Sequence, residues 1–169
     1  KINRRLEETA EYFKNKFSLE DSIEEIMNDW NTMAYNYYTN DIKLKPGALQ
    51  YLLKLKELGI KIGLATSNSM HLLTTTLKSN NAFELFDAIT VTDEVEKSKS
   101  NPDIYLLAAK KLGVNPSECM VFEDIIAAVY GAKLAGMKVT GVYDKHSEHQ
   151  IDILKKECDN YIYNYEDLI

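Results

Sequence analysis

The sequence predicts an α/β protein, in which helices flank a mainly parallel sheet and a short all-helical part comes first. Two patterns predict this fold class. From residue 45 onward, short apolar runs alternate with amphipathic segments, and strands that alternate with helices form parallel sheets through right-handed crossovers. Residues 1–40 show helical periodicity alone. We therefore expect a helical part over residues 1–44 and the α/β core over residues 45–169.

The helical part should consist of two helices. Apolar residues recur with a spacing that lines one helical face, first in Leu6, Ala10, Phe13 and Phe17 and then in Ile23, Met27, Trp30 and Ala34. Ser18, with Asp21 three residues further on, is the expected cap of the second helix. Because Lys1 falls inside a helical pattern, we expect the chain to be a piece of a longer protein.

The core should begin after Pro46 and Gly47, which interrupt the helical pattern. In order, we expect a helix at about 47–57, a buried strand in IKIGLAT (60–66), a helix at about 70–79 and a strand near 88–92. The next helix should have Asn101 as its cap and Pro102 at its first position. The expected apolar face of that helix comprises Ile104, Leu107, Ala108 and Leu112. Further along lie a strand in CMVFED (119–124), a helix at about 126–135 and strands at 138–143 and 160–164.

Composition argues against several classes of partner and site. The 169 residues carry a net charge of -6 and no basic block, so a nucleic-acid partner is not expected. No apolar stretch approaches the length of a membrane span, so no membrane partner is expected. Cys119 and Cys158 lack the spacing of a metal site. We expect a reduced, cytoplasmic protein.

Polar side chains follow two of the predicted strands. Thr66, Ser67 and Asn68 end the strand in IKIGLAT, and Glu123 and Asp124 end the strand in CMVFED. Each feature alone has an ordinary explanation, because a threonine at a strand end commonly caps a helix and an acidic pair commonly faces a helix N-terminus. Ligands of parallel sheets, however, bind beyond the carboxyl ends of the strands. The combination therefore favours a site over separate structural roles.

The loop that precedes Pro102 adds positive charge through Lys97 and Lys99. A single loop lysine is usually solvated, but here it accompanies two adjacent carboxylates, which repel each other unless a cation or a proton lies between them. Mg²⁺ takes oxygen ligands and commonly bridges to phosphate. A hydroxyl, a lysine and a metal-binding acidic pair would together stabilise the charge of a transferring phosphoryl group.

Three segments in this order resemble the haloacid dehalogenase superfamily: LKPGALQYLLKLKELGIKIGLATSNS, SKSNPDIYLLAAKKLGV and MVFEDIIAAVYGAKLAGMKVTGV. The subgroup is that of the phosphatases and phosphomutases similar to beta-phosphoglucomutase, and the likeness covers about residues 20–169. The resemblance implies a Rossmann-like core, a helical cap that includes residues 1–44, Mg²⁺ as the cofactor and a small phosphorylated metabolite as the substrate.

The resemblance also implies a role for each polar residue of the phosphate cradle. Thr66 corresponds to the hydroxyl that hydrogen-bonds a phosphoryl oxygen, and Ser67 and Asn68 correspond to positions that contact phosphate or substrate. Lys99 corresponds to the lysine that neutralises the nucleophile and the phosphoryl group. We prefer Lys99 to Lys97 because Lys99 stands three residues before a proline, as the lysine of the family does.

Glu123 and Asp124 correspond to the acidic pair that holds Mg²⁺, directly or through water. The sequence departs from the family pattern at three positions in or beside the matched motifs. Ser100 stands where proline is common, Ile125 stands where a small polar residue usually follows the acidic pair, and Ala128 replaces a frequent glycine. Ile125 removes a hydroxyl from the metal loop but leaves both carboxylates in place.

The largest departure concerns the first motif of the family, DxDx[TV], whose two aspartates act as nucleophile and as general acid/base. The sequence contains no such motif, because Asp21, Asp29 and Asp41 do not end an apolar strand. This chain alone is therefore expected to be inactive.

In the family, the strand that carries DxDx[TV] lies between the strands in IKIGLAT and CMVFED. Without it, buried backbone groups would lack partners at about 1–3 kcal/mol each. We consider three arrangements: a retained N-terminal fragment completes the sheet, the two flanking strands pair directly, or self-association with a second copy supplies the edge.

The expected activity of the complete protein is Mg²⁺-dependent phosphoryl transfer through an aspartyl-phosphate, as a phosphatase or a sugar-phosphate mutase. The main alternative is a catalytically degenerate binding or interaction protein, which Ile125 and the absent motif favour. A receiver-type signalling domain is disfavoured because its acidic pair would precede the threonine. A dinucleotide dehydrogenase is disfavoured because no GxGxxG occurs.

Overall fold

The computed structural model describes residues 2–169, with side chains from Leu6 onward, and the chain divides into two compact units. The first unit ends at Ile42 and the second runs from Lys43 to Ile169. The expectation drawn from Lys1 concerns a residue outside the described ones. The role of residues 1–44 as part of a cap remains a prediction, because the structure of neither unit tests it.

The first unit is a pair of helices, α1 (Ile2–Phe17) and α2 (Ile23–Asn40). Ala10 and Ile26 are its buried apolar residues among the described side chains. The rings of Phe13 and Trp30 meet edge to face with centroids 5.4 Å apart. The two apolar faces thus pack on each other, as amphipathic helices do when each buries its stripe against the other.

The cap of α2 differs from the predicted one. Ser22, not Ser18, caps the helix: its hydroxyl accepts from the backbone N–H of Glu25, whose carboxylate accepts from the N–H of Ser22 in return. Ser18 has a φ of 52° and belongs to the turn after α1. The sequence held two serines with an acidic residue three positions on, and the length of the turn decided between them.

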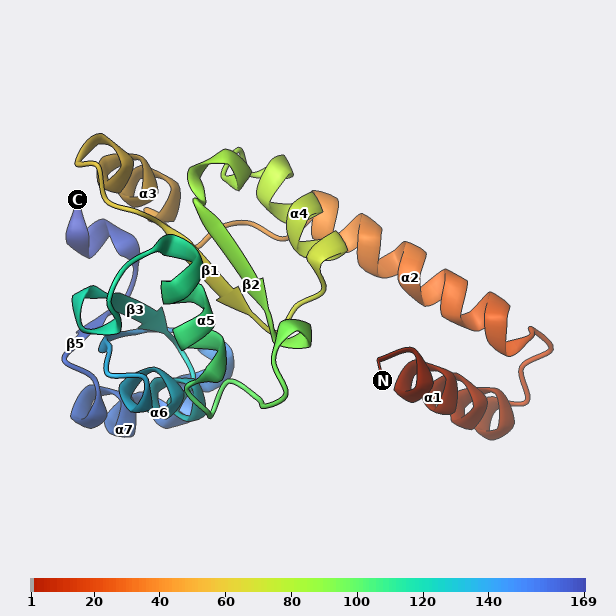
Figure 1. Ribbon diagram of the computed structural model, residues 1–169. Coiled ribbons are helices and arrows are strands. Elements are labelled where there is room, and N and C mark those ends of the chain that lie inside the picture. The colour runs from red at the N-terminus through yellow and green to blue at the C-terminus, as the bar shows by residue number, and fades with distance from the viewer. Residues whose placement is uncertain (1) are drawn as a thin grey trace. The chain divides into compact units, whose positions relative to one another are not determined.

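The second unit alternates strands and helices, which confirms the predicted α/β class (Figure 1). Its elements in order are α3 (Ala48–Glu57), β1 (Gly63–Thr66), α4 (Met70–Ser79), β2 (Ala88–Val91), α5 (Asp103–Leu112), β3 (Met120–Glu123), α6 (Ile126–Leu134), β4 (Lys138–Val142), α7 (Ile151–Glu157) and β5 (Asn160–Ile162). A short 3-10 turn, η5 (Tyr165–Leu168), follows β5.

The strands form two separate parallel sheets rather than one. β1 pairs with β2, and β3, β4 and β5 pair in that order. Within the described residues β1 and β3 do not pair, so direct pairing of these two strands, one of the three arrangements considered, is wrong. Each of the two strands therefore has one edge without a strand partner among residues 2–169.

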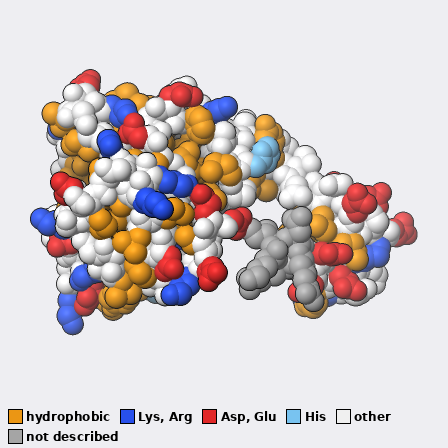
Figure 2. Space-filling view, viewed as in Figure 1, with side chains coloured by type: hydrophobic (Ala, Val, Ile, Leu, Met, Phe, Trp, Pro, Cys, Tyr) orange, Lys and Arg blue, Asp and Glu red, His pale blue; other side chains and the backbone are white. Residues whose placement is uncertain are grey.

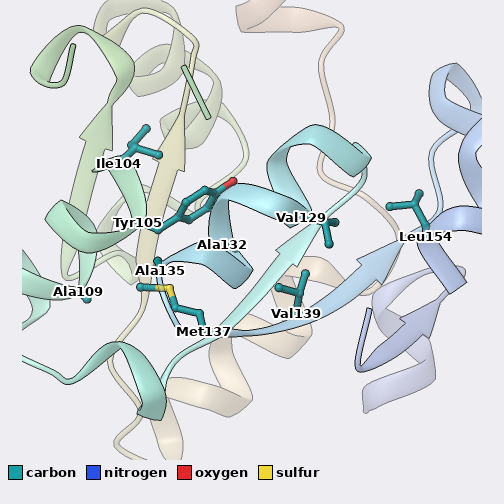
Figure 3. Packing of buried hydrophobic residues seen from close by; sticks show 9 residues of the cluster. All are labelled: Ile104, Tyr105, Ala109, Val129, Ala132, Ala135, Met137, Val139 and Leu154. Carbon is teal, nitrogen blue, oxygen red and sulfur yellow. The ribbon is translucent and has the colours of Figure 1, made fainter. Parts of the chain in front are cut away.

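One hydrophobic cluster nevertheless joins the two sheets (Figure 3). Ala65 of β1 and Val121 of β3 both pack against it, beneath helices α5, α6 and α7. The buried members of the cluster are Ile104, Tyr105, Ala109, Val129, Ala132, Ala135, Met137, Val139 and Leu154. On the opposite face of the first sheet, Leu64 and Ile89 pack against a second cluster formed around α4 by Leu73, Leu77 and Ala82. Shared side-chain packing thus holds together two sheets that no strand pairing connects.

Two predictions in the core need correction. α5 begins at Asp103, and Pro102 takes the cap position that was expected of Asn101. Its buried residues are Ile104, Tyr105 and Ala109, whereas Leu107, Ala108 and Leu112 are only half-buried. Helix α7 was not predicted at all. Its surroundings are polar, and within the helix only Leu154 is fully buried.

The surface of the second unit mixes charge types. On the face in Figure 2, basic and acidic side chains alternate over residues 43–169, and no block of one sign covers it. No helix in the described part of the chain combines the length and the apolar character that crossing a membrane requires.

Candidate active site

The first part of the site is the turn after β1, which Thr66 begins. The Thr66 hydroxyl oxygen accepts from the backbone N–H of Asn68 at 3.1 Å, and Asn68 Oδ1 accepts from the N–H of Ser69 at 2.9 Å. Ser69 then caps α4 by accepting from Leu72 N–H. Ser67 is exposed. The polar run therefore shapes the turn itself, and the Thr66 hydroxyl keeps its hydrogen for another acceptor.

The second part lies at the end of β3, where Glu123 is only 8% exposed. Lys99 Nζ forms an ion pair with Glu123 Oε1, and the Tyr105 hydroxyl donates to the same oxygen at 2.9 Å. Lys99 also lies over the Tyr105 ring, 5.8 Å from its centroid. A buried carboxylate is costly unless it is paired and hydrogen-bonded, and these two donors meet that requirement.

Tyr105 is itself 2% exposed and belongs to the main hydrophobic cluster. Figure 3 shows its ring reaching from α5 with the hydroxyl directed away from Met137. Burial, followed by the charge of Glu123 and the hydrogen bond to it, raises the pKa of the Tyr105 hydroxyl. The hydroxyl therefore stays protonated and acts as a donor to Glu123.

The loop that carries Lys99 rests on helix α6. A Cβ placed on Gly131 would lie within 3.0 Å of the carbonyl oxygens of Lys99 and Asn101, so the helix and the loop can approach this closely only because position 131 has no side chain. Lys97 is exposed, whereas the Lys99 side chain is 20% exposed. The fold therefore distinguishes the two lysines, since Lys99 pairs with Glu123 while Lys97 is exposed.

Asp124 follows Glu123 and is half-buried. Burial is the largest cause of the raised pKa of the Tyr165 hydroxyl, and the charges of Asp124 and Glu123 add to it. The Tyr165 ring also packs against Phe122 and Tyr51, with centroids 5.5 and 5.8 Å away. The turn η5 therefore closes one side of the acidic pair with an aromatic wall.

The donor chemistry of the acidic pair fits a hard divalent cation. Among the described residues, no group donates a hydrogen bond to Glu123 Oε2. The Asp124 carboxylate likewise forms no hydrogen bond or ion pair with them. No group of three His, Cys, Asp or Glu side chains gathers there or elsewhere in the described chain. Mg²⁺ commonly takes one or two carboxylates and fills its other positions with water and phosphate oxygens, so two carboxylates suffice for a partial site.

The structure brings some of the predicted site residues together and leaves others apart. Lys99 and Glu123 are in contact, and Asp124 adjoins them in the chain. Among the described residues, no interaction joins Thr66 or Asn68 to Lys99 or Glu123. The phosphate-binding role of Thr66, Ser67, Asn68 and Lys99 and the metal-binding role of Glu123 and Asp124 therefore remain predictions.

Sequence reasoning missed Tyr105. The signal is present, because Tyr105, Ala109 and Leu112 follow a helical i, i+4, i+7 spacing that is as regular as that of the predicted face. A tyrosine on a buried face needs a partner for its hydroxyl, which could have directed attention to a polar group beneath α5.

Comparison with known proteins finds relatives among the haloacid dehalogenase-like hydrolases. The sequence profile of the haloacid dehalogenase-like hydrolases matches residues 1–142. YhcW of Bacillus subtilis, whose provisional name is that of a phosphatase, is 47% identical over 103 residues, which is 61% of this chain and 47% of that protein. Hexitol phosphatase B of Escherichia coli is 34% identical over 95 residues, which is 56% of this chain and 43% of the enzyme.

Solved structures of similar fold also come from proteins related to phosphoryl transfer by name or bound ligand. CbbY from Rhodobacter sphaeroides, crystallised with phosphate, matches with a TM-score of 0.76 and 25% identity over 89% of this chain and 67% of that one. The beta-phosphoglucomutase of Clostridium difficile matches with a TM-score of 0.69 and 25% identity over 98% of this chain and 72% of that one.

The match to YhcW leaves about half of that relative without a counterpart, since this chain spans 47% of its length. The family profile, by contrast, extends over most of the chain and includes the ends of β1 and β3 and the lysine loop between them. On this match, the chain belongs to the haloacid dehalogenase-like hydrolase family.

Proposed function

We propose that the protein containing this chain transfers a phosphoryl group from a small phosphorylated metabolite to water or to a sugar hydroxyl, with Mg²⁺ as its cofactor. The contact of Lys99 with Glu123 at the end of β3, beside Asp124, is the observation that carries this proposal. The names of the relatives support it, since hexitol phosphatase B and the validoxylamine A 7'-phosphate phosphatase of Streptomyces hygroscopicus both act on phosphate esters.

The side chains of this chain would act mainly through charge. When bound at Glu123 and Asp124, Mg²⁺ would neutralise charge on phosphoryl oxygens. Lys99 would add positive charge to the same group, and the Thr66 hydroxyl would donate its remaining hydrogen to a phosphoryl oxygen, with Ser67 and Asn68 beside it.

The nucleophile is proposed to be an aspartate that this sequence does not contain. Its carboxylate would attack phosphorus while the second aspartate of the same motif gives a proton to the leaving alcohol of the ester. Water or a sugar hydroxyl, losing its proton to that second aspartate, would then take the phosphoryl group from the aspartyl-phosphate and restore the carboxylate. The chain alone is accordingly proposed to be inactive. Cys119 and Cys158 are both free, which supports a reducing, cytoplasmic setting.

An additional strand would supply that aspartate. β1 and β3 each pair along one edge only, while Ala65 and Val121 pack on one shared cluster. We propose that an N-terminal strand, from a longer chain or a retained fragment, lies between β1 and β3. A strand from a second copy is the competing outcome, and the intact mass together with the mass in solution distinguishes the two.

The test measures phosphate release from a panel of phosphate esters, and isomerisation of the sugar phosphates among them, by the full-length protein with Mg²⁺ and with excess EDTA. We expect release or isomerisation that EDTA abolishes and that Asp124→Asn lowers strongly, and neither reaction by residues 1–169 alone. Release by residues 1–169 at the rate of the full-length protein would show that the proposed nucleophile is wrong.

One observation favours a binding protein as the second candidate. Ile125, directly after Asp124, is 48% exposed, so an apolar side chain occupies the loop of the proposed metal site. If the full-length protein binds phosphate esters in calorimetry but neither releases phosphate from any of them nor moves it to another sugar hydroxyl, this second candidate replaces the enzyme.

A further inference from the structure

The hydroxyl of Tyr105 has no part in the function proposed above, yet it makes the most buried polar contact of the site. It donates to Glu123 Oε1 at 2.9 Å, and Lys99 Nζ pairs with the same oxygen. The three side chains come from different elements: α5, the end of β3 and the loop before α5. The hydrogen bond therefore links helix α5 to the carboxylate at the end of the strand.

The two oxygens of Glu123 have different surroundings as a result. Oε1 receives both the tyrosine and the lysine. No donor of the described residues reaches Oε2, and Oε2 is not among the buried side-chain atoms that lack a partner, which are Thr90 Oγ1 and Tyr161 OH. Oε2 therefore keeps contact with solvent and is the oxygen that an approaching cation would meet.

We propose that Tyr105 is a positioning residue, whose hydroxyl fixes the Glu123 carboxylate so that Oε1 faces Lys99 and Oε2 faces a divalent cation. The inference rests on the proposed function, because it assigns the orientation of one of the proposed metal ligands. Tyr105 contacts neither metal nor substrate in this arrangement, and it acts only through Glu123.

The physical reason is the freedom of the carboxylate group. The terminal torsion of a glutamate is broad and nearly two-fold, so a single ion pair with a long lysine side chain would not hold one oxygen in place. A second donor on a buried, rigid ring removes that freedom. Partners that orient a metal ligand in this way typically change metal affinity by 10–100-fold when they are removed.

The experiment measures Mg²⁺ binding by calorimetry, without substrate, in the full-length protein. Tyr105→Phe removes the hydroxyl and keeps the ring in the core. Tyr161→Phe is the matched control, because the Tyr161 hydroxyl is also buried but has no hydrogen-bond partner among the described residues. We expect Tyr105→Phe to weaken Mg²⁺ binding about tenfold and Tyr161→Phe to leave it within about twofold of the wild type.

A second arm separates positioning from packing. Tyr105→Phe is combined with Glu123→Gln, which removes the charge of the ligand and leaves its size. In that background, Tyr105→Phe should weaken Mg²⁺ binding no further. Equal weakening in both backgrounds would assign the effect to packing and overturn the proposal. The proposal is also overturned if Tyr105→Phe alone binds Mg²⁺ within about twofold of the wild type.

A third variant keeps this inference distinct from the proposed function. If Asp124→Asn loses Mg²⁺ while Tyr105→Phe binds it like the wild type, only the role of Tyr105 is wrong. If the wild type binds no Mg²⁺, or if Asp124→Asn binds it equally well, the metal site of the proposed function fails and the positioning role fails with it.

Discussion

Two lysines of one loop show how burial separates residues of the same type. Lys97 and Lys99 are two positions apart, and either could serve as the cation of the site. Only Lys99 reaches a buried carboxylate, since Lys97 is exposed. An exposed lysine is screened by water and salt, so the two residues should differ sharply in what their removal does.

Lys99→Met should lower phosphate release by the full-length protein by about 100-fold or more, as expected when a charge that stabilises the transition state is lost. Lys97→Met should change it less than about threefold. Steady-state kinetics on both variants tests this, and equal effects of the two substitutions would contradict the assignment of Lys99.

A second residue-scale prediction concerns Lys45 and Asp144, which pair at 2.5 Å in the second unit. The hydrogen bond from Lys45 is the largest cause that holds the pKa of Asp144 below its usual 3.8. A carboxyl whose pKa is lowered by folding stabilises the folded state above its unfolded pKa, and this contribution is lost as the pH falls through the folded pKa.

Asp144→Asn should therefore reduce the free energy of unfolding near neutral pH by about 0.5–1 kcal/mol, a modest amount because the pair is partly exposed. The difference from the wild type should shrink as the pH falls below 3.8. Urea unfolding at several pH values measures it, with Asp152→Asn at an exposed position as a control for the loss of one acidic side chain. A difference that persists at the lowest pH would contradict the linkage.

Among the elements of the second unit, helix α6 comes very close to the loop that carries Lys99. Gly131 makes this approach possible, since a Cβ there would be within 3.0 Å of the carbonyl oxygens of Lys99 and Asn101. In an exposed helix, alanine would be favoured over glycine by up to about 1 kcal/mol. The clash with backbone atoms should outweigh this gain, because neither the helix nor the loop is a flexible side chain.

Gly131→Ala should consequently lower the free energy of unfolding by about 1–3 kcal/mol and reduce activity through displacement of Lys99. Leu134→Ala, on the same helix but 68% exposed, should leave both nearly unchanged. Thermal unfolding together with kinetics measures the two effects. A Gly131→Ala protein with wild-type stability would mean that helix and loop are further apart than the structure shows.

Across the molecule, all the strands of residues 2–169 lie in the second unit, and they divide into two separate parallel sheets. β1 and β3 share a hydrophobic cluster but not a ladder. Backbone N–H groups along an unpaired strand edge exchange with solvent faster than those in a complete sheet. A strand added between β1 and β3 should therefore be visible in the exchange rates of both.

Hydrogen exchange of residues 63–66 and 120–123 should be slower in the full-length protein than in residues 1–169 alone. Amides of β4, which is paired on both sides, serve as the internal control and should change less. Equal exchange of β1 and β3 in both proteins would contradict an additional strand between them.

Local sequence patterns were enough to predict the order of strands and helices other than α7, the parallel arrangement and the candidate residues at the strand ends. These follow from local signals: the spacing of apolar residues, the breaks at proline and glycine, and the placement of polar residues such as Thr66 and Glu123 directly after apolar runs. Such signals act over a few residues, and the structure retains them with shifts of one to three residues at the ends of elements.

Which residues meet depends on the packing of the folded chain. It selected Ser22 over Ser18 as a cap, buried Tyr105 against Glu123 and set Gly131 against the lysine loop. It also kept β1 and β3 apart. The physical reason is that each of these outcomes depends on how distant segments pack, and the free energy of packing is set by the shape and burial of all partners together rather than by any local pattern.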